Sequence, residues 1–117
     1  MPTLQKFKDL EIWQLARALS KKVFLLTKTE KLCRDFSLKD QMNRSSGSIM
    51  DNIAEGFGRG GRLEFIQFLS ISSGSADELK SQFYRCEDRE YIEDKCFNEL
   101  YNDAFVLNKR LMDLLNT

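Results

Sequence analysis

The most informative part of this chain is the sequence QMNRSSGSIMDNIAEGFGR (residues 41–59). Its apolar residues have helical spacing, yet its middle consists of the small residues Ser45, Ser46, Gly47 and Ser48. A second run of small residues lies within a helical pattern in SISSGSADEL (residues 70–79). Glycine inside a helix costs about 1 kcal/mol relative to alanine. Two helices that accept this cost are expected to pack closely, to form a site, or both.

The rest of the chain favours long helices in one domain. It has 117 residues, enough for a single core, and its only proline is Pro2. No apolar run approaches the roughly 20 residues that span a membrane, and there is no signal-peptide pattern. Three cysteines without a CxxC pair fit reduced thiols in a cytoplasmic protein. The absence of histidine removes the usual general base and the commonest transition-metal ligand.

Four helices are predicted, at about residues 9–28, 37–56, 62–89 and 93–115. Their apolar residues alternate steps of three and four, which is typical of near-parallel helix packing, and the short links make neighbours antiparallel. The sequence therefore predicts an all-α, antiparallel up-down-up-down four-helix bundle that forms one domain over residues 1–117. The expected inner residues are Ile12, Ala16, Leu19, Val23 and Leu26; Leu38, Met42, Ser45, Ile49 and Ile53; Phe65, Leu69, Ser72, Ala76, Leu79, Phe83 and Cys86; and Phe97, Leu100, Ala104, Leu107, Leu111 and Leu114.

The expected helix ends rest on capping residues. Asp9 is predicted to cap the first helix and Ser37 the second, with Asp40 three positions on. Gly56 is predicted to end the second helix, ahead of a glycine-rich link. Residues 29–36 are predicted to be a polar connection.

The two runs of small residues are expected to meet. If the second and third helices are antiparallel about a turn near residue 60, Gly47 faces Ser72–Gly74 and Ser45 faces Ser75. Either the backbones approach closely, with the serine hydroxyls bonded to carbonyls, or the runs line a polar pocket. Close packing predicts that leucine at Gly47 or Gly74 would destabilise the fold.

Three carboxylates raise the alternative of an enzyme. Asp51 and Glu55 are one turn apart, and Glu78 is on the neighbouring helix. Bundle metal sites pair such acids with a Glu-x-x-His motif, and this chain has no histidine. We therefore predict no catalytic residue, metal or cofactor, and expect Asn52 and Glu55 to stabilise the glycine-rich turn.

The charges divide along the chain. Residues 1–62 hold 12 Lys/Arg and 7 Asp/Glu, whereas residues 63–117 hold 6 and 11. The bundle topology places the N-terminus, the glycine-rich link and the C-terminus at one end, which is expected to be basic, and the other end acidic. Basic side chains beside a glycine-rich loop either are solvated or contact phosphates. The candidate nucleic-acid contacts are Lys6, Lys8, Arg44, Arg59 and Arg62.

GFGRGG (residues 56–61) is not a P-loop, because it lacks the Lys-Ser/Thr ending and follows a helix instead of a strand. Nucleotide hydrolysis is therefore disfavoured.

A second apolar stripe is predicted on the last helix: Tyr101, Phe105, Met112 and Leu115. Trp13 and Phe24 similarly lie beyond the inner face of the first helix. One bundle buries about one stripe per helix, so the extra residues either widen the core or cover a second surface. We interpret them as a self-association interface.

Three segments carry a family resemblance: FKDLEIWQLA (residues 7–16), SIMDNIAEGFGR (residues 48–59) and EFIQFLSISSGSADEL (residues 64–79). In this order they resemble the four-helix-bundle proteins encoded by intervening sequences of bacterial 23S ribosomal RNA genes. The residues that we assign to helix packing and to this family motif are Ser48, Asn52, Glu55, Gly56, Gly74, Ser75 and Glu78.

The resemblance extends to accessory proteins of diversity-generating retroelements, which form basic pentamers that bind a reverse transcriptase and nucleic acid. It implies a non-enzymatic homo-oligomer, with a pentamer favoured, whose partners are RNA, DNA or a protein. A purely structural homo-oligomer is the alternative, followed by the carboxylate-site enzyme.

Overall fold

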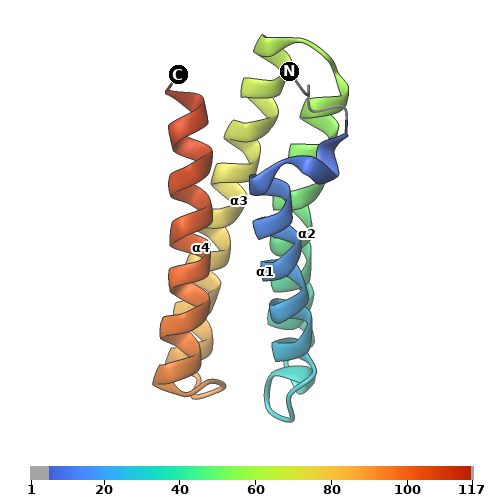
Figure 1. Ribbon diagram of the computed structural model, residues 1–117. Helices are drawn as coiled ribbons and strands as arrows, with labels where there is room; N and C mark the ends of the chain where they lie inside the picture. Colours follow the sequence, from blue (N-terminus) through green and yellow to red (C-terminus); the bar gives the residue numbers. More distant parts are fainter. Residues whose placement is uncertain (1–5, 117) are drawn as a thin grey trace.

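The computed structural model describes residues 6–116 and consists of four long antiparallel helices (Figure 1). It measures 48 × 22 × 21 Å along its principal axes. Neighbouring helices in the chain pack against each other, and the first also contacts the last, so the predicted up-down-up-down bundle is confirmed. The described residues contain no strand. The helical elements are η1 (Phe7–Asp9), α1 (Glu11–Thr27), η2 (Leu32–Arg34), α2 (Phe36–Gly58), α3 (Arg62–Asp88) and α4 (Asp94–Leu115).

The core follows the predicted stripes closely. Every inner residue expected on α1 and α2 is buried, as are those of α3 from Leu69 onward. The end of α4 differs, because Leu114 is 40% exposed while Leu115 is partly buried against the core. An α-helix has 3.6 residues per turn, so after several alternating steps a second step of four keeps the inward direction. Leu115 therefore takes the place expected for Leu114.

The predicted caps are wrong by one or two residues. Asp9 ends the 3₁₀ turn η1, and Leu10 precedes α1 without a side-chain cap. Asp35, not Ser37, caps α2, because its Oδ1 accepts a hydrogen bond from the Leu38 backbone N–H at 3.2 Å. The predicted polar connection also contains Leu32, whose side chain is fully buried and anchors the link to the core.

The second helix continues two residues past its predicted end at Gly56, to Gly58. Gly60 then takes a positive φ of 80°, a left-handed conformation that suits glycine, and α3 begins at Arg62. This turn lies at the same end of the bundle as both chain termini, as predicted (Figure 1). No helix among residues 6–116 is both long and apolar enough to cross a membrane.

Candidate functional site

The two runs of small residues do meet, through serine hydroxyls. The Ser72 hydroxyl donates to the Ile49 carbonyl at 2.9 Å, and the Ser75 hydroxyl donates to Ser48 Oγ at 2.9 Å. Asn52 Nδ2 donates to the Ser48 carbonyl at 2.8 Å. These bonds satisfy polar groups that close packing would otherwise leave without water. The arrangement is that of a packed contact between α2 and α3, which we call the α2–α3 seam.

The seam continues through a cluster of three polar side chains. Ser45 Oγ donates to Glu78 Oε1 at 2.5 Å and accepts from Gln82 Nε2 at 3.0 Å. Ser45 therefore faces Glu78 and Gln82, and its predicted neighbour Ser75 bonds Ser48 instead. The register differs because α2 extends beyond Gly56 and moves the turn along the chain. The buried Oε1 of Gln82 has no hydrogen-bond partner among the described residues.

The glycines of the two runs are not the points of closest approach. A Cβ atom added at Gly47 or Gly74 would meet nothing within 4 Å, so the expectation that both pack tightly is wrong. Neighbouring serines occupy the inward positions, which turns both glycines outward. Gly56 is the close contact, since its Cβ would lie 2.5 Å from Phe68 Cβ.

The three carboxylates of the enzyme alternative do not gather. Glu55 forms an ion pair with Arg59 at 2.8 Å, Glu78 accepts from Ser45, and Asp51 is exposed. Within the described part of the chain, no group of three metal-ligating side chains is close enough to hold an ion.

The five basic residues predicted to contact nucleic acid are not brought together. Lys6 precedes η1 and Lys8 lies within it, at the end of the bundle that holds the α2–α3 turn, where Arg59 and Arg62 also lie. Arg44 is fifteen positions before Arg59 on α2, which corresponds to about 22 Å along a helix. It forms an ion pair with Asp40 at 3.1 Å.

The end that was predicted to be basic carries both signs of charge. Arg59 is paired with Glu55, and Arg110 with Glu11 at 2.6 Å. Further acids in the same elements are Asp9, Glu64 and Asp113. A strong positive field at this end is therefore not supported by the arrangement of side chains.

At the opposite end a polar cluster joins the start of α2 to the α3–α4 link. Asp35 Oδ2 accepts hydrogen bonds from Tyr91 at 2.8 Å and from Arg89 at 2.6 Å. The bond from Tyr91 is the main cause that lowers the pKa of Asp35, with the Leu38 amide and Arg89 adding to it. This cluster fixes the helix start and is a structural feature.

Basic residues that the sequence reasoning missed lie on α1. After Glu11, the segment 12–29 contains four cations and no acid. Lys22 is bonded to α4, but Arg17, Lys21 and Lys28 are exposed. No carboxylate among residues 6–116 lies within ion-pair distance of these three. The sequence carried this signal as a segment, residues 12–29, that holds basic residues and no acidic ones.

A hollow of about 380 Å³ lies beside these cations, between α1 and α2. Phe24 is half exposed at its wall, and the ammonium of Lys28 is 4.9 Å from the centre of the Phe24 ring. Asn43 Nδ2 donates to Thr27 Oγ1 at 3.3 Å within it. The residues that line the hollow are Phe24, Thr27, Lys28, Cys33, Lys39 and Asn43.

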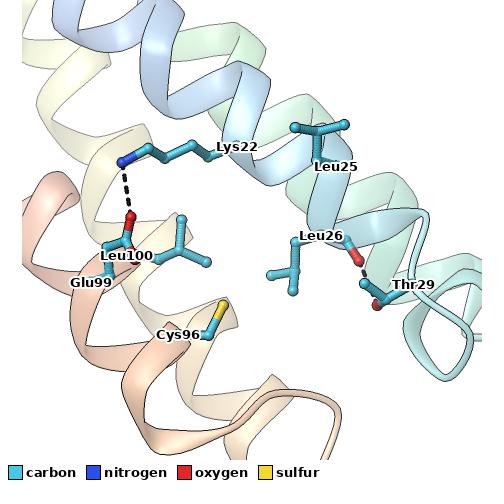
Figure 2. A pocket seen from close by; sticks show the side chains of 7 residues that line it. All are labelled: Lys22, Leu25, Leu26, Thr29, Cys96, Glu99 and Leu100. Carbon is cyan, nitrogen blue, oxygen red and sulfur yellow. Dashed lines mark hydrogen bonds and ion pairs between the residues drawn. The ribbon is translucent and has the colours of Figure 1, made fainter.

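A second groove, of about 330 Å³, separates α1 from α4 (Figure 2). Lys22 reaches across it to Glu99 Oε1 at 3.2 Å and to Asp103 Oδ2 at 2.7 Å. The hydrogen bond to Asp103, and to a smaller extent the one to Glu99, raises the pKa of Lys22. Leu25, Leu26, Thr29, Cys96 and Leu100 complete the lining. Burial raises the pKa of the Cys96 thiol, so this groove offers packing surface in place of a reactive nucleophile.

The predicted outer stripe of α4 is divided between core and surface. Phe105 is 52% exposed and Met112 is 42% exposed, whereas Tyr101 and Leu115 are partly buried against the core. Tyr84 of α3, 47% exposed, contacts the Tyr101 ring, with 5.4 Å between the ring centres. We call Tyr84, Tyr101, Phe105 and Met112 the α3–α4 patch.

The chain matches the family model of the 23S rRNA-intervening sequence protein over residues 8–113. It is similar to a crystal structure of a protein of unknown function from the S23 ribosomal protein family of Bacteroides thetaiotaomicron, with a TM-score of 0.83 and 24% sequence identity. The alignment covers 91% of this chain and 99% of that one. None of the curated proteins matches this chain. Neither matching description names an enzymatic activity.

Proposed function

Because the chain belongs to the family of 23S rRNA-intervening sequence proteins, we propose that it is a non-enzymatic, homo-oligomeric module that binds nucleic acid. The observation that carries this proposal is the set of unpaired cations on one side of the bundle: Arg17, Lys21 and Lys28 on α1 and Lys39 on α2. We call them the α1–α2 cations. A phosphate backbone gains affinity from each cation that replaces a condensed counterion.

The α1–α2 cations are better supported as phosphate contacts than the set that the sequence suggests. Arg44 and Arg59 already face carboxylates, at 3.1 and 2.8 Å. A phosphate would have to compete with those carboxylates for the guanidinium. Lys28 and Lys39 instead face only aromatic rings, at 4.9 and 5.1 Å from the ring centres. They can turn to a phosphate without breaking an ion pair.

The α3–α4 patch supports self-association. Three of its side chains are about half exposed, and large apolar side chains that gather on one face of a small domain commonly mark an interface. Because the helices contact one another in the order α1, α2, α3, α4 and back to α1, this patch and the α1–α2 cations lie on opposite sides of the bundle (Figure 1). In a ring of subunits, with five expected, each subunit presents two different surfaces to its two neighbours. We place the α3–α4 patch in one of these surfaces and leave the α1–α2 cations outside both.

The binding proposal is tested by removing charges from α1. Arg17→Gln with Lys21→Gln should weaken binding of a labelled RNA or DNA strand and lower the slope of log affinity against log salt by about 0.7 per lost contact. The matched control is Arg59→Gln with Arg110→Gln, which removes two cations already paired with Glu55 and Glu11. Equal slopes in the two variants would contradict the assignment.

Self-association is tested by light scattering of the protein alone. We expect a mass above the 13.7 kDa of one chain at micromolar concentration, and a lower mass for Phe105→Asp, which places a charge in the α3–α4 patch. A wild-type mass near 13.7 kDa would contradict the oligomer. An oligomer that binds no strand at about 50 mM salt, where phosphate contacts are strongest, would favour the alternative of a purely structural assembly.

A further inference from the structure

We propose that the hollow between α1 and α2 receives an unpaired base of a single-stranded nucleic acid, with the base stacked on Phe24 and the flanking phosphates held by Lys28 and Lys39. This inference rests on the proposed function and specifies its substrate class. Its basis is the meeting of an aromatic wall, two unpaired ammonium groups and an amide in one hollow of about 380 Å³.

The aromatic wall is accessible to a ligand. Phe24 is 50% exposed although its neighbour Val23 is fully buried, so the ring stands at the rim of the core. Phe36, at the start of α2, is 73% exposed. A base that stacks on such a ring removes apolar area of both partners from water, and every base has a π-face that can do so.

Two lysine ammonium groups lie beside aromatic rings at this site. The Lys28 ammonium lies 4.9 Å from the centre of the Phe24 ring, and the Lys39 ammonium lies 5.1 Å from the centre of the Phe36 ring. Both lysines also line the hollow. When a base takes a ring face, the flexible lysine stem lets the ammonium move to the adjoining phosphate, which keeps its charge compensated. The same pairing of a ring and a cation recurs towards the start of α1, where Arg17 Cζ lies 5.6 Å from the centre of the Trp13 ring.

The lining favours a nucleotide over a purely apolar ligand. Asn43 is half buried in the lining of the hollow, where it donates to Thr27, and its amide adds hydrogen-bonding groups that an apolar ligand could not use. The exposed acids that flank the lining residues in the chain, Glu30 and Asp40, are engaged by Arg34 and Arg44 at 3.3 and 3.1 Å. The rim therefore presents cations to an incoming strand with little opposing charge.

The geometry discriminates between single strands and duplexes. In a duplex the bases are stacked and paired inside, so a ring in the wall of a hollow cannot reach a base face. An unstacked base of a single strand can be splayed out onto an aromatic side chain. Duplex nucleic acid could contact only the outer charges of α1, which predicts weaker binding.

The test is a titration of the full chain into two labelled RNAs, a single strand of roughly 12 nucleotides and the duplex of the same length, followed by fluorescence anisotropy. We expect the single strand to bind more tightly. Phe24→Leu should weaken single-strand binding by about fivefold or more, since base stacking on the aromatic ring is lost. The control is Leu25→Ala, which trims an apolar residue, 55% exposed, that faces the α1–α4 groove; it should bind like the wild type.

A second variant keeps the proposal testable if the aromatic variant misfolds. Lys28→Gln with Lys39→Gln leaves the core untouched and should flatten the salt dependence for the single strand. If the aromatic variant binds like the wild type, or if the duplex binds as tightly as the single strand, the stacking site is overturned while the proposed function stands. If neither RNA binds the wild type at about 50 mM salt, both fall.

Discussion

The seam between α2 and α3 and the seam between α1 and α4 are built in opposite ways. Along α2–α3, small residues bring the helices together, with Gly56 against Phe68 and the Ser72 hydroxyl on the Ile49 carbonyl. Along α1–α4, the helices leave a groove of about 330 Å³ that the long side chain of Lys22 bridges at its rim (Figure 2). The first seam is held by the close approach of the two backbones, and the second by a long side chain that spans the groove.

The two seams should tolerate different kinds of substitution. In a closely packed seam an extra methyl group has nowhere to go, because interiors are packed as densely as organic crystals. In an open seam the bridging groups are solvated, so their attraction is weakened by water and salt. The α2–α3 seam should therefore be sensitive to volume, and the α1–α4 seam to charge and ionic strength.

The largest effect is expected at Gly56. Gly56→Ala puts a Cβ at 2.5 Å from Phe68 Cβ, a distance that requires the helices to shift. We expect the free energy of unfolding to fall by about 1–3 kcal/mol, measured by urea denaturation followed by circular dichroism. Helix propensity alone predicts the opposite sign, because alanine is the better helix former.

Gly47→Ala is the matched control, since it makes the same substitution in the same helix. Its new Cβ would meet nothing within 4 Å, so propensity should raise the free energy of unfolding by about 0.5–1 kcal/mol. If both variants shifted stability in the same direction, the close approach at Gly56 would be refuted.

The smaller effect is expected at Lys22. Lys22→Met keeps most of the stem that lines the groove but removes its bonds to Glu99 and Asp103. Because the side chain is 44% exposed, we expect a loss of no more than about 1 kcal/mol in the free energy of unfolding. The difference from the wild type should shrink in about 1 M salt. A salt-independent loss would mean that packing, not charge, bridges the groove.

Lys22 also predicts an alkaline dependence with a definite sign. Its bonds to Asp103 and Glu99 raise its pKa in the folded state above the ordinary 10.5, so the native state holds the proton more tightly than the unfolded chain. The stabilisation is complete below that ordinary value and is lost as pH rises through the raised pKa. The stability difference between wild type and Lys22→Met should be constant near neutral pH and should narrow above about pH 10.5. A difference that widened there would contradict the pairing.

Much of the fold could be read from residue spacing. The inner residues of α1 and α2 were predicted in full because hydrophobic periodicity reports directly which side of a helix is buried. The residues at which the helices start were harder to predict. Asp35 and Ser37 both suit an N-cap, and the choice depends on which side chain reaches the Leu38 amide. Leu114 and Leu115 differ by one position, and their places depend on the accumulated rotation of the helix.

The candidate surfaces were less predictable than the core. The basic residues near the glycine-rich turn stood out in the sequence, but the acids of that end did not, such as Glu11 of α1, which pairs with Arg110 of α4. The sequence could not show which cations of α1 are unpaired, because only the fold shows that Lys22 is engaged by α4 while Lys21 and Lys28 are not. Asn43 and Phe24, which are nineteen positions apart, share the hollow only because α1 and α2 are antiparallel.

The sequence alone was sufficient for the class of this protein: four helices, one bundle and a family shared over residues 8–113. These properties follow from local periodicity and from the order of short motifs, which need no knowledge of distant contacts. Only the tertiary structure decided that Gly56 and not Gly47 is the tight contact, and that Arg44 is paired while Lys28 faces a ring. The physical reason is that the register between helices and the pairing of charges depend on side chains far apart in the chain, and a small shift in the α2–α3 turn changes which of them meet.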